Sequence, residues 1–137
     1  MKDHAVIILR DGEKVLFVQR AATKKSLPNI WAFPSGTMEE GETAEVTVAR
    51  EAKEELRVDV GIENFFSTVE LSELGARLHF VACKQIGLDP IIFDPVEIQQ
   101  TQWLTFDEFF NTYTDDQIGH GLIYLRRNPE IWKSFFK

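Results

Sequence analysis

The chain has 137 residues, a length that suits one domain with a hydrophobic core and leaves little room for a second domain. Hydrophobic residues make up 44% and charged residues 27%, a globular balance that excludes a disordered chain. The formal net charge of −7 excludes long-range attraction to nucleic-acid polymers and anionic membranes, although a local cation or metal ion can still bind a small anion.

The single cysteine, Cys83, lies in an apolar run, so no intrachain disulfide forms and a buried structural thiol is expected. The first eleven residues contain too few consecutive apolar residues for a signal peptide or a membrane span, and no other stretch reaches membrane length. We therefore expect a cytoplasmic protein. The 11 phenylalanines indicate a core that depends on aromatic packing.

Strands are expected in six segments with a strand-like composition. In chain order they are residues 5–9, 14–19, 31–33, 65–71, 76–86 and 98–104. Asp11-Gly12 has a strong preference for a hairpin turn, and a second turn is expected near Gly75. Residues 21–30 and 87–95 contain prolines and are expected to form loops.

The clearest helix is expected over residues 43–57. Thr43 is a good N-cap, and Glu45 lies favourably in the first turn. Four apolar residues recur at intervals of four and form the stripe that faces a core. They are Ala44, Val48, Ala52 and Leu56.

Three shorter helices are expected in the last third of the chain. Residues 105–108 match a capping box, residues 114–117 repeat that pattern, and Pro129 falls in the first turn of a C-terminal helix. The order of strands, helix, strands and helices predicts a mixed α/β fold in one domain over residues 1–137.

Three glutamates on the expected helix suggest chemistry. Glu51, Glu54 and Glu55 have the spacing i, i+3, i+4 and share one side of the helix, with Glu55 at the edge of the apolar stripe. Their mutual repulsion would be relieved by a hard divalent cation, and Mg²⁺ prefers carboxylate and phosphate oxygens. Arg50 precedes Glu54 by four residues and can hold its carboxylate. Taken alone, these glutamates also fit an ordinary surface helix.

The complete spacing from residue 36 to residue 58 distinguishes the segment from an ordinary surface helix. It resembles the Nudix box, G-x5-E-x7-R-E-U-x-E-E-x-G-U, where U is a bulky aliphatic residue. The matching positions are Gly36, Glu42, Arg50, Glu51, Glu54, Glu55 and Val58. Ala52 is smaller than the usual aliphatic residue. Arg57 stands where the family has a glycine, which commonly allows a left-handed turn at the helix end.

The resemblance extends from about residue 15 to residue 104. Residues 19–22 and 33–36 look like the corresponding stretches of MutT-like nucleoside triphosphate pyrophosphohydrolases, in which a glycine usually stands at the position of Ser35. Glu97, six residues before Trp103, resembles the distal glutamate that reaches the metal in MutT-like proteins. The implied fold is a Nudix-like α/β/α sandwich with a mixed central β-sheet.

The resemblance also implies a set of metal ligands for Mg²⁺ or Mn²⁺. The set consists of the backbone carbonyl of Ser35 and the side chains of Glu51, Glu54, Glu55 and Glu97. Water would attack one phosphorus of a phosphoanhydride, and the metal would orient the phosphates and lower the pKa of the water. Glu54 and Glu97 are the candidates for the general base, Glu51 stays open, and Arg50 is assigned to the catalytic set.

Two further residues are candidates for substrate binding. Arg20 follows an apolar strand and would face the phosphates, with a solvated strand end as the alternative. Phe33 would stack on a base or fill the core. Lys24 and Lys25 could contact phosphate from their loop, although solvation is the simpler expectation.

The leading hypothesis is a MutT-like enzyme that hydrolyses a nucleoside triphosphate, and three alternatives stay open. The substrate could be another nucleoside diphosphate-linked compound. ADP-ribose is disfavoured as the substrate, because enzymes that hydrolyse it often have a proline about fifteen residues after the box. In this chain the first proline after Val58 is Pro90. An isopentenyl diphosphate isomerase is disfavoured by the intact box and the lack of a suitably placed cysteine. A non-catalytic nucleotide sensor is the third alternative. The resemblance also implies a possible homodimer, because homodimers are frequent in the family.

Overall fold

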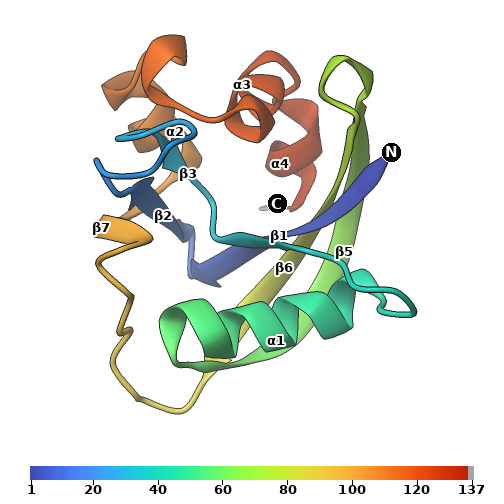
Figure 1. Cartoon of the computed structure of the whole chain (residues 1–137), viewed down its shortest axis with the longest axis vertical. Coiled ribbons are helices and arrows are strands. Elements are labelled where there is room, and N and C mark those ends of the chain that lie inside the picture. The colour runs from blue at the N-terminus through green and yellow to red at the C-terminus, as the bar shows by residue number, and fades with distance from the viewer. Residues whose placement is uncertain (136–137) are drawn as a thin grey trace. The chain divides into compact units, whose positions relative to one another are not determined.

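The computed structural model describes residues 1–135, apart from the side chains of residues 65, 66 and 135 (Figure 1). The chain divides into two compact units, each made of two segments. The first unit contains residues 1–10 and 34–92, and the second contains residues 11–33 and 93–137. Strands and helices occur in both, which confirms the mixed α/β class. No helix in residues 1–135 is long and apolar enough to cross a membrane.

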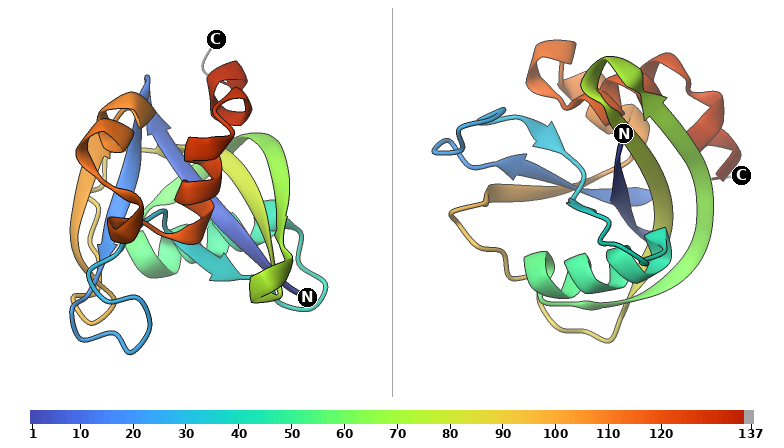
Figure 2. Two further views of the ribbon diagram at one scale, coloured as in Figure 1. Left: turned by 90° about the horizontal axis from the view of Figure 1, so that it is seen from above. Right: turned by 45° about the vertical axis from the view of Figure 1, so that its right-hand side comes forward.

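The first unit is a mixed sheet with one helix beside it. Its elements are β1 (Lys2–Asp11), β4 (Ser35–Thr37), α1 (Ala44–Leu56), β5 (Asp59–Leu71), the 3-10 helix η1 (Ser72–Leu74) and β6 (Ala76–Ile86). Strand β1 pairs in parallel with β6 and antiparallel with β4, and β5 pairs antiparallel with β6. Figures 1 and 2 show α1 running beside the sheet, where it contacts β4, β5 and β6.

Strand β1 is central because its sequence suits burial on both faces. Residues 5–9 are all apolar, and every one of them is buried. Such a continuous apolar run is typical of a strand covered on both sides, whereas a half-exposed strand alternates apolar and polar residues. The strand places Val6 opposite Ser35, and in this way it fixes the position of β4.

The second unit is a three-stranded antiparallel sheet with helices made by the C-terminal part of the chain. Its strands are β2 (Lys14–Arg20), β3 (Trp31–Ala32) and β7 (Ile98–Leu104), and β2 lies between the other two. Its helices are α2 (Phe106–Thr112), the 3-10 helix η2 (Asp115–Gln117), α3 (His120–Arg127) and α4 (Glu130–Phe135).

Aromatic rings form the core of the second unit, as the composition indicates. The rings of Phe17 and Phe109 stack with centroids 3.9 Å apart, and those of Phe106 and Trp132 stack at 4.8 Å. The capping box expected at residues 105–108 is present and begins α2, which contributes Phe106 and Phe109 to this cluster. Together, these contacts hold the C-terminal helices against β2 within the unit.

The limits of β1, β2, β3 and β5 differ from the expected ones, most of all in β5, and one strand was not expected. Strand β5 begins at Asp59, six residues before the expected start, and the short strand β4 was not expected. Polar residues and glycine in both segments give little strand preference. Pairing with β6 and β1 nevertheless forms the strands, with irregular register in β5 near Ile62 and Phe65.

The end of α1 keeps the left-handed turn that the Nudix box usually reserves for glycine. Arg57 has φ 59° and ψ 33°, and its backbone N–H donates to the carbonyls of Ala52 and Lys53. This conformation costs a residue with a Cβ atom free energy that glycine avoids. These hydrogen bonds therefore hold the left-handed conformation at the end of α1, and the backbone of Arg57 is strained as a result.

We expect Arg57→Gly to be more stable than Arg57→Ala by about 1 kcal/mol, because both variants lose the same side chain and only glycine relieves the left-handed strain. Urea unfolding of the two variants measures this difference. Equal unfolding midpoints would show that the backbone at this position carries no strain.

Candidate metal and catalytic site on the helix Ala44–Leu56

Arg50 is the centre of an ion-pair network on α1. Its Nε and Nη2 donate to the two carboxylate oxygens of Glu42, each at 2.9 Å. Its Nη1 donates to Glu51 at 2.8 Å and lies 3.4 Å from Glu54, while Nη2 also donates to the carbonyl of Thr37 at 3.3 Å. One guanidinium therefore orients three glutamates of the box and ties α1 to the end of β4.

Glu42 is the most tightly held of these carboxylates. It also accepts hydrogen bonds from the Glu39 backbone N–H at 2.8 Å and from the hydroxyl of the buried Thr47 at 2.9 Å. The Arg50 guanidinium is the largest cause that lowers the pKa of Glu42, from an ordinary value of 4.5 to about 2. In return, the pKa of Arg50 is raised above its ordinary value. Glu42 is therefore a permanent anion that holds Arg50 in place.

The lowered pKa of Glu42 predicts an acid-dependent loss of stability. Ionised Glu42 stabilises the folded state above about pH 4.5, and this contribution is lost as the pH falls through about 2. We expect the free energy of unfolding to fall less steeply over this range in Glu42→Gln than in the wild type. Urea unfolding at stepped pH measures both slopes, with the exposed Glu40→Gln as control. Parallel slopes in wild type and Glu42→Gln would contradict the assignment.

Gly36 lies directly against the carboxyl group of Glu51. A Cβ atom added at Gly36 would come within 2.2 Å of Glu51 Cδ, so any side chain there would force the Glu51 carboxyl group to move. The carbonyl of Ser35 is bonded to the nitrogen of Gly36, so it lies in the same short stretch of β4. The structure thus brings Ser35 and Glu51, both assigned to the metal from the sequence, next to each other.

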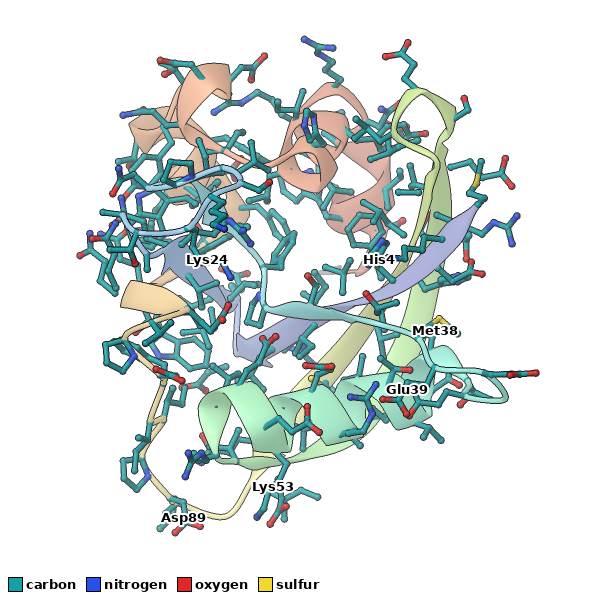
Figure 3. All side chains as sticks on the ribbon, in the orientation of Figure 1. His4, Lys24, Met38, Glu39, Lys53 and Asp89 are labelled. Carbon is teal, nitrogen blue, oxygen red and sulfur yellow. The ribbon has the colours of Figure 1, made fainter. Side chains whose placement is uncertain are left out.

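The remaining glutamates of the helix differ in exposure. The Glu51 side chain is 14% exposed and the Glu54 side chain is 58% exposed. Glu55 is partly buried, as its place at the edge of the apolar stripe predicts. Lys53 projects from the lower side of α1 in Figure 3 and pairs with Asp59 at 3.2 Å. Glu54 therefore combines a weak contact to Arg50 with good access to solvent.

The donors on α1 and β4 suit a hard divalent cation. Carboxylate and carbonyl oxygens are the ligands that Mg²⁺ and Mn²⁺ take in proteins. In residues 1–135 no three His, Cys, Asp or Glu side chains converge on one point in metal-binding geometry, and Glu51 faces Arg50. By donor chemistry and by the contact between Gly36 and Glu51, the residues present fit the metal that the Nudix box implies.

Glu97 belongs to the second unit, where it contacts the loop of residues 21–30. Its carboxylate pairs with Lys24 Nζ at 2.6 Å, and its backbone carbonyl accepts from the Ala21 N–H at 3.0 Å. The Glu97 side chain is 55% exposed. Glu97 is thus an accessible carboxylate with a cation beside it, and nothing in the sequence indicated Lys24 as its partner.

Arg20 is turned into the same loop. Its guanidinium donates to the carbonyl of Ser26 at 2.8 and 3.1 Å and to the carbonyl of Leu27 at 3.2 Å. These acceptors are neutral, so they fix the position of the guanidinium and leave its charge uncompensated. Arg20 is therefore not a solvated strand end, because these hydrogen bonds hold its side chain against the loop. The same bonds order the loop.

Phe33 is only 6% exposed and its ring stacks on Phe17, with centroids 5.4 Å apart. A base can stack only on an exposed ring face, so this packing favours the core alternative for Phe33 over direct contact with substrate.

Sequence reasoning assigned Arg50 to Glu54 and did not identify Glu42 as its main partner. Glu42 precedes α1 and lies eight residues before Arg50, so helical spacing gives no indication of the contact. The sequence feature that could have identified Glu42 is the fixed position of a glutamate at this point of the Nudix box.

Known proteins resemble this chain in sequence. The family model described as the NUDIX domain matches residues 2–125. The chain belongs to the Nudix family. Nudix hydrolase 2 of Arabidopsis thaliana is 30% identical over 108 residues, which cover 76% of this chain and 38% of that protein. Dihydroneopterin triphosphate diphosphatase of Escherichia coli K12 is 41% identical over 58 residues, 42% of this chain and 36% of that protein.

Solved structures share the fold. The MutT protein of Methanosarcina mazei Go1 superimposes with a TM-score of 0.67 at 14% sequence identity, covering 98% of this chain and 89% of that one. The Nudix-like α/β fold expected from the box is thereby confirmed. The chain spans less than half the length of the two curated relatives named above, at 38% and 36%.

Proposed function

We propose that this chain is a Mg²⁺-dependent hydrolase that cuts a phosphoanhydride bond in a nucleoside triphosphate, in the manner of MutT-like pyrophosphohydrolases. The observation that carries the proposal is the Arg50 network. One guanidinium holds Glu42 through both carboxylate oxygens and contacts Glu51 and Glu54, all at box positions. A surface helix with incidental ion pairs has no reason to fix its carboxylates in this way, because exposed pairs contribute little to stability.

The proposed metal ligands are the Ser35 carbonyl and the side chains of Glu51, Glu54, Glu55 and Glu97. When bound, Mg²⁺ would neutralise phosphate charge and lower the pKa of the attacking water. Arg50 keeps Glu51 turned toward the Gly36 strand, and Glu42 keeps Arg50 in place.

Glu54 is our leading candidate for the group that accepts the proton of the attacking water. Among the three Nudix-box glutamates that pair with Arg50, it is the most exposed, and its 3.4 Å contact with that guanidinium is the longest. A weakly held carboxylate can change its protonation state with less loss of structure than Glu42 can. Glu97 remains the alternative base, since its side chain is also exposed.

The substrate class is supported by one relative. The Escherichia coli protein that is 41% identical over 58 residues is named for a triphosphate. Arg20, Lys24 and Lys25 line one hollow of the second unit and provide cations that suit phosphate groups. Another nucleoside diphosphate-linked substrate is the second candidate, since the same cations would serve it.

The test is a substrate panel with product identification. The chain is incubated with Mg²⁺ and, separately, nucleoside triphosphates, dinucleoside polyphosphates and nucleoside diphosphate sugars, and phosphorus NMR identifies the products. We expect a nucleoside triphosphate to yield a nucleoside monophosphate and pyrophosphate. Turnover of linked diphosphates alone would favour the second candidate. Nucleotide binding without turnover of any compound would identify a sensor.

A further inference from the structure

Strand β7 has an irregular register where it pairs with the end of β2. Gln19 pairs with Gln100, whereas the next residue, Arg20, pairs with Ile98. Gln99 is therefore the extra residue of a β-bulge. A bulge gives a side chain a direction that it would not have in a regular strand, and bulges are frequent beside functional sites.

Gln99 holds the loop of residues 21–30 through its side-chain amide. The amide nitrogen donates to the carbonyl of Arg20 at 3.1 Å and to the side-chain oxygen of Asn29 at 2.7 Å. These two bonds use both hydrogens of that nitrogen. Asn29 is also held through its backbone, since its N–H donates to the Arg20 carbonyl at 3.1 Å and its carbonyl accepts from the Gln19 amide at 3.0 Å. The end of the loop is thus tied to the ends of β2 and β7.

The backbone of this loop is strained. Leu27 has φ 51° and Asn29 has φ 63°, and both values lie in the left-handed region. A bulky residue such as leucine rarely adopts this conformation, which persists only where surrounding contacts enforce it. In this conformation the carbonyls of Ser26 and Leu27 accept from the Arg20 guanidinium at 2.8 to 3.2 Å. The shape of the loop and the position of the Arg20 side chain are therefore fixed together.

The guanidinium held in this way lines a hollow of the second unit. The lining residues are Arg20, Thr23, Lys24, Lys25, Ser26 and Val96. Figure 3 shows Lys24 in the loop between β2 and β3, and its charge is paired with Glu97. Within residues 1–135, Lys25 has no ion pair and Arg20 Nη1 has no hydrogen bond. The N–H groups of this nitrogen and the Lys25 ammonium group suit the oxygens of a phosphate group.

We propose that Gln99 is a positioning residue that acts through Asn29 and holds Arg20 where it can bind a phosphate group in this hollow. The proposal rests on the proposed function only in taking that phosphate to be part of the substrate. Without the Gln99 amide, the Asn29 side chain loses this hydrogen bond, and its left-handed backbone is held less firmly. The carbonyls of Ser26 and Leu27 then hold the guanidinium less well. The anion itself must order Arg20, which weakens binding.

The test is a titration with inorganic pyrophosphate in excess chelator, followed through the backbone amide signals of residues 21–27 in NMR spectra. The chelator removes divalent metal, so the titration reports on the hollow alone. We expect Gln99→Leu to weaken pyrophosphate binding about two- to tenfold, the effect of a hydrogen bond between neutral groups. Arg20→Met should weaken it by about tenfold or more, because its hydrogen bonds to the anion are charged. In the Arg20→Met background, Gln99→Leu should have no further effect.

Gln102→Leu is the matched control. It makes the same change in the same strand, where the Gln102 side chain accepts from the Tyr113 hydroxyl at 2.7 Å. We expect this variant to bind pyrophosphate as the wild type does, and thermal melts show that every variant is folded. An equal loss of affinity in the Gln99 and Gln102 variants would refute the role of Gln99.

The other outcomes separate this inference from the proposed function. If Gln99→Leu binds pyrophosphate as tightly as the wild type, or if its effect persists in the Arg20→Met background, Gln99 does not act through Arg20 and the proposal is refuted. If the wild type binds no pyrophosphate in excess chelator, the hollow is not a phosphate site and the proposal also fails. The proposed hydrolysis depends on metal and is decided independently by the substrate panel.

Discussion

Replacing Glu54 with glutamine is expected to lower kcat by roughly two to four orders of magnitude, the range that a positioned general base contributes. The change keeps the shape of the side chain and removes its charge. Because Glu54 is 58% exposed and only 3.4 Å from Arg50 at its closest, the free energy of unfolding should change by less than about 0.5 kcal/mol. Turnover of the preferred substrate and thermal melting measure the two effects separately.

Glu45→Gln is the matched control for this variant. It makes the same chemical change in the first turn of the same helix, outside the Arg50 network, and should keep wild-type turnover. A Glu54→Gln protein that turns over at the wild-type rate per folded molecule would remove Glu54 from the catalytic set.

Replacing Gly36 with alanine is expected to reduce activity or metal affinity by about 10- to 100-fold, the usual effect of disturbing the support of a metal ligand. The new Cβ atom would lie 2.2 Å from Glu51 Cδ, so the carboxyl group must move away from its position beside Arg50. The displaced group is the end of a flexible side chain, and melting should therefore change little. Metal titration and kinetics of the variant measure the loss.

Gly61→Ala provides the control within the same sheet. Its added Cβ atom would meet only Ile86, at an ordinary distance of 3.6 Å, so metal binding and turnover should be unchanged. Equal behaviour of the Gly36 and Gly61 variants would show that the contact between Gly36 and Glu51 does not position the carboxylate.

Elements with a strong local signal were predictable from sequence. Thr43 caps α1 through its side chain as expected, and the apolar stripe of the helix is buried. Strand β7 has the expected limits of residues 98 and 104, and the run of residues 5–9 lies inside β1. For α1 and β1 the signal, a cap, a helical period or a continuous apolar run, depends on neighbouring residues only.

Contacts between residues distant in sequence were not predictable in the same way. Strand β4 exists because β1 pairs with it, and its own sequence of Ser, Gly and Thr gives little indication of a strand. The pairs of Arg50 with Glu42 and of Lys24 with Glu97 join residues 8 and 73 positions apart, which no helical or strand period connects. The fixed positions of the Nudix box identified Glu42 as a motif residue but did not show that it pairs with Arg50. No sequence motif indicated that Lys24 pairs with Glu97.

The most direct test of the metal-dependent mechanism is turnover of the preferred substrate before and after removal of divalent metal. We expect activity to vanish in excess chelator and to return when Mg²⁺ is restored, because in the proposed mechanism the carboxylates of α1 and the backbone carbonyl of Ser35 would hold a cation that neutralises phosphate charge. Full turnover in excess chelator would contradict the account, since the glutamates held by Arg50 would then have no metal to bind during catalysis.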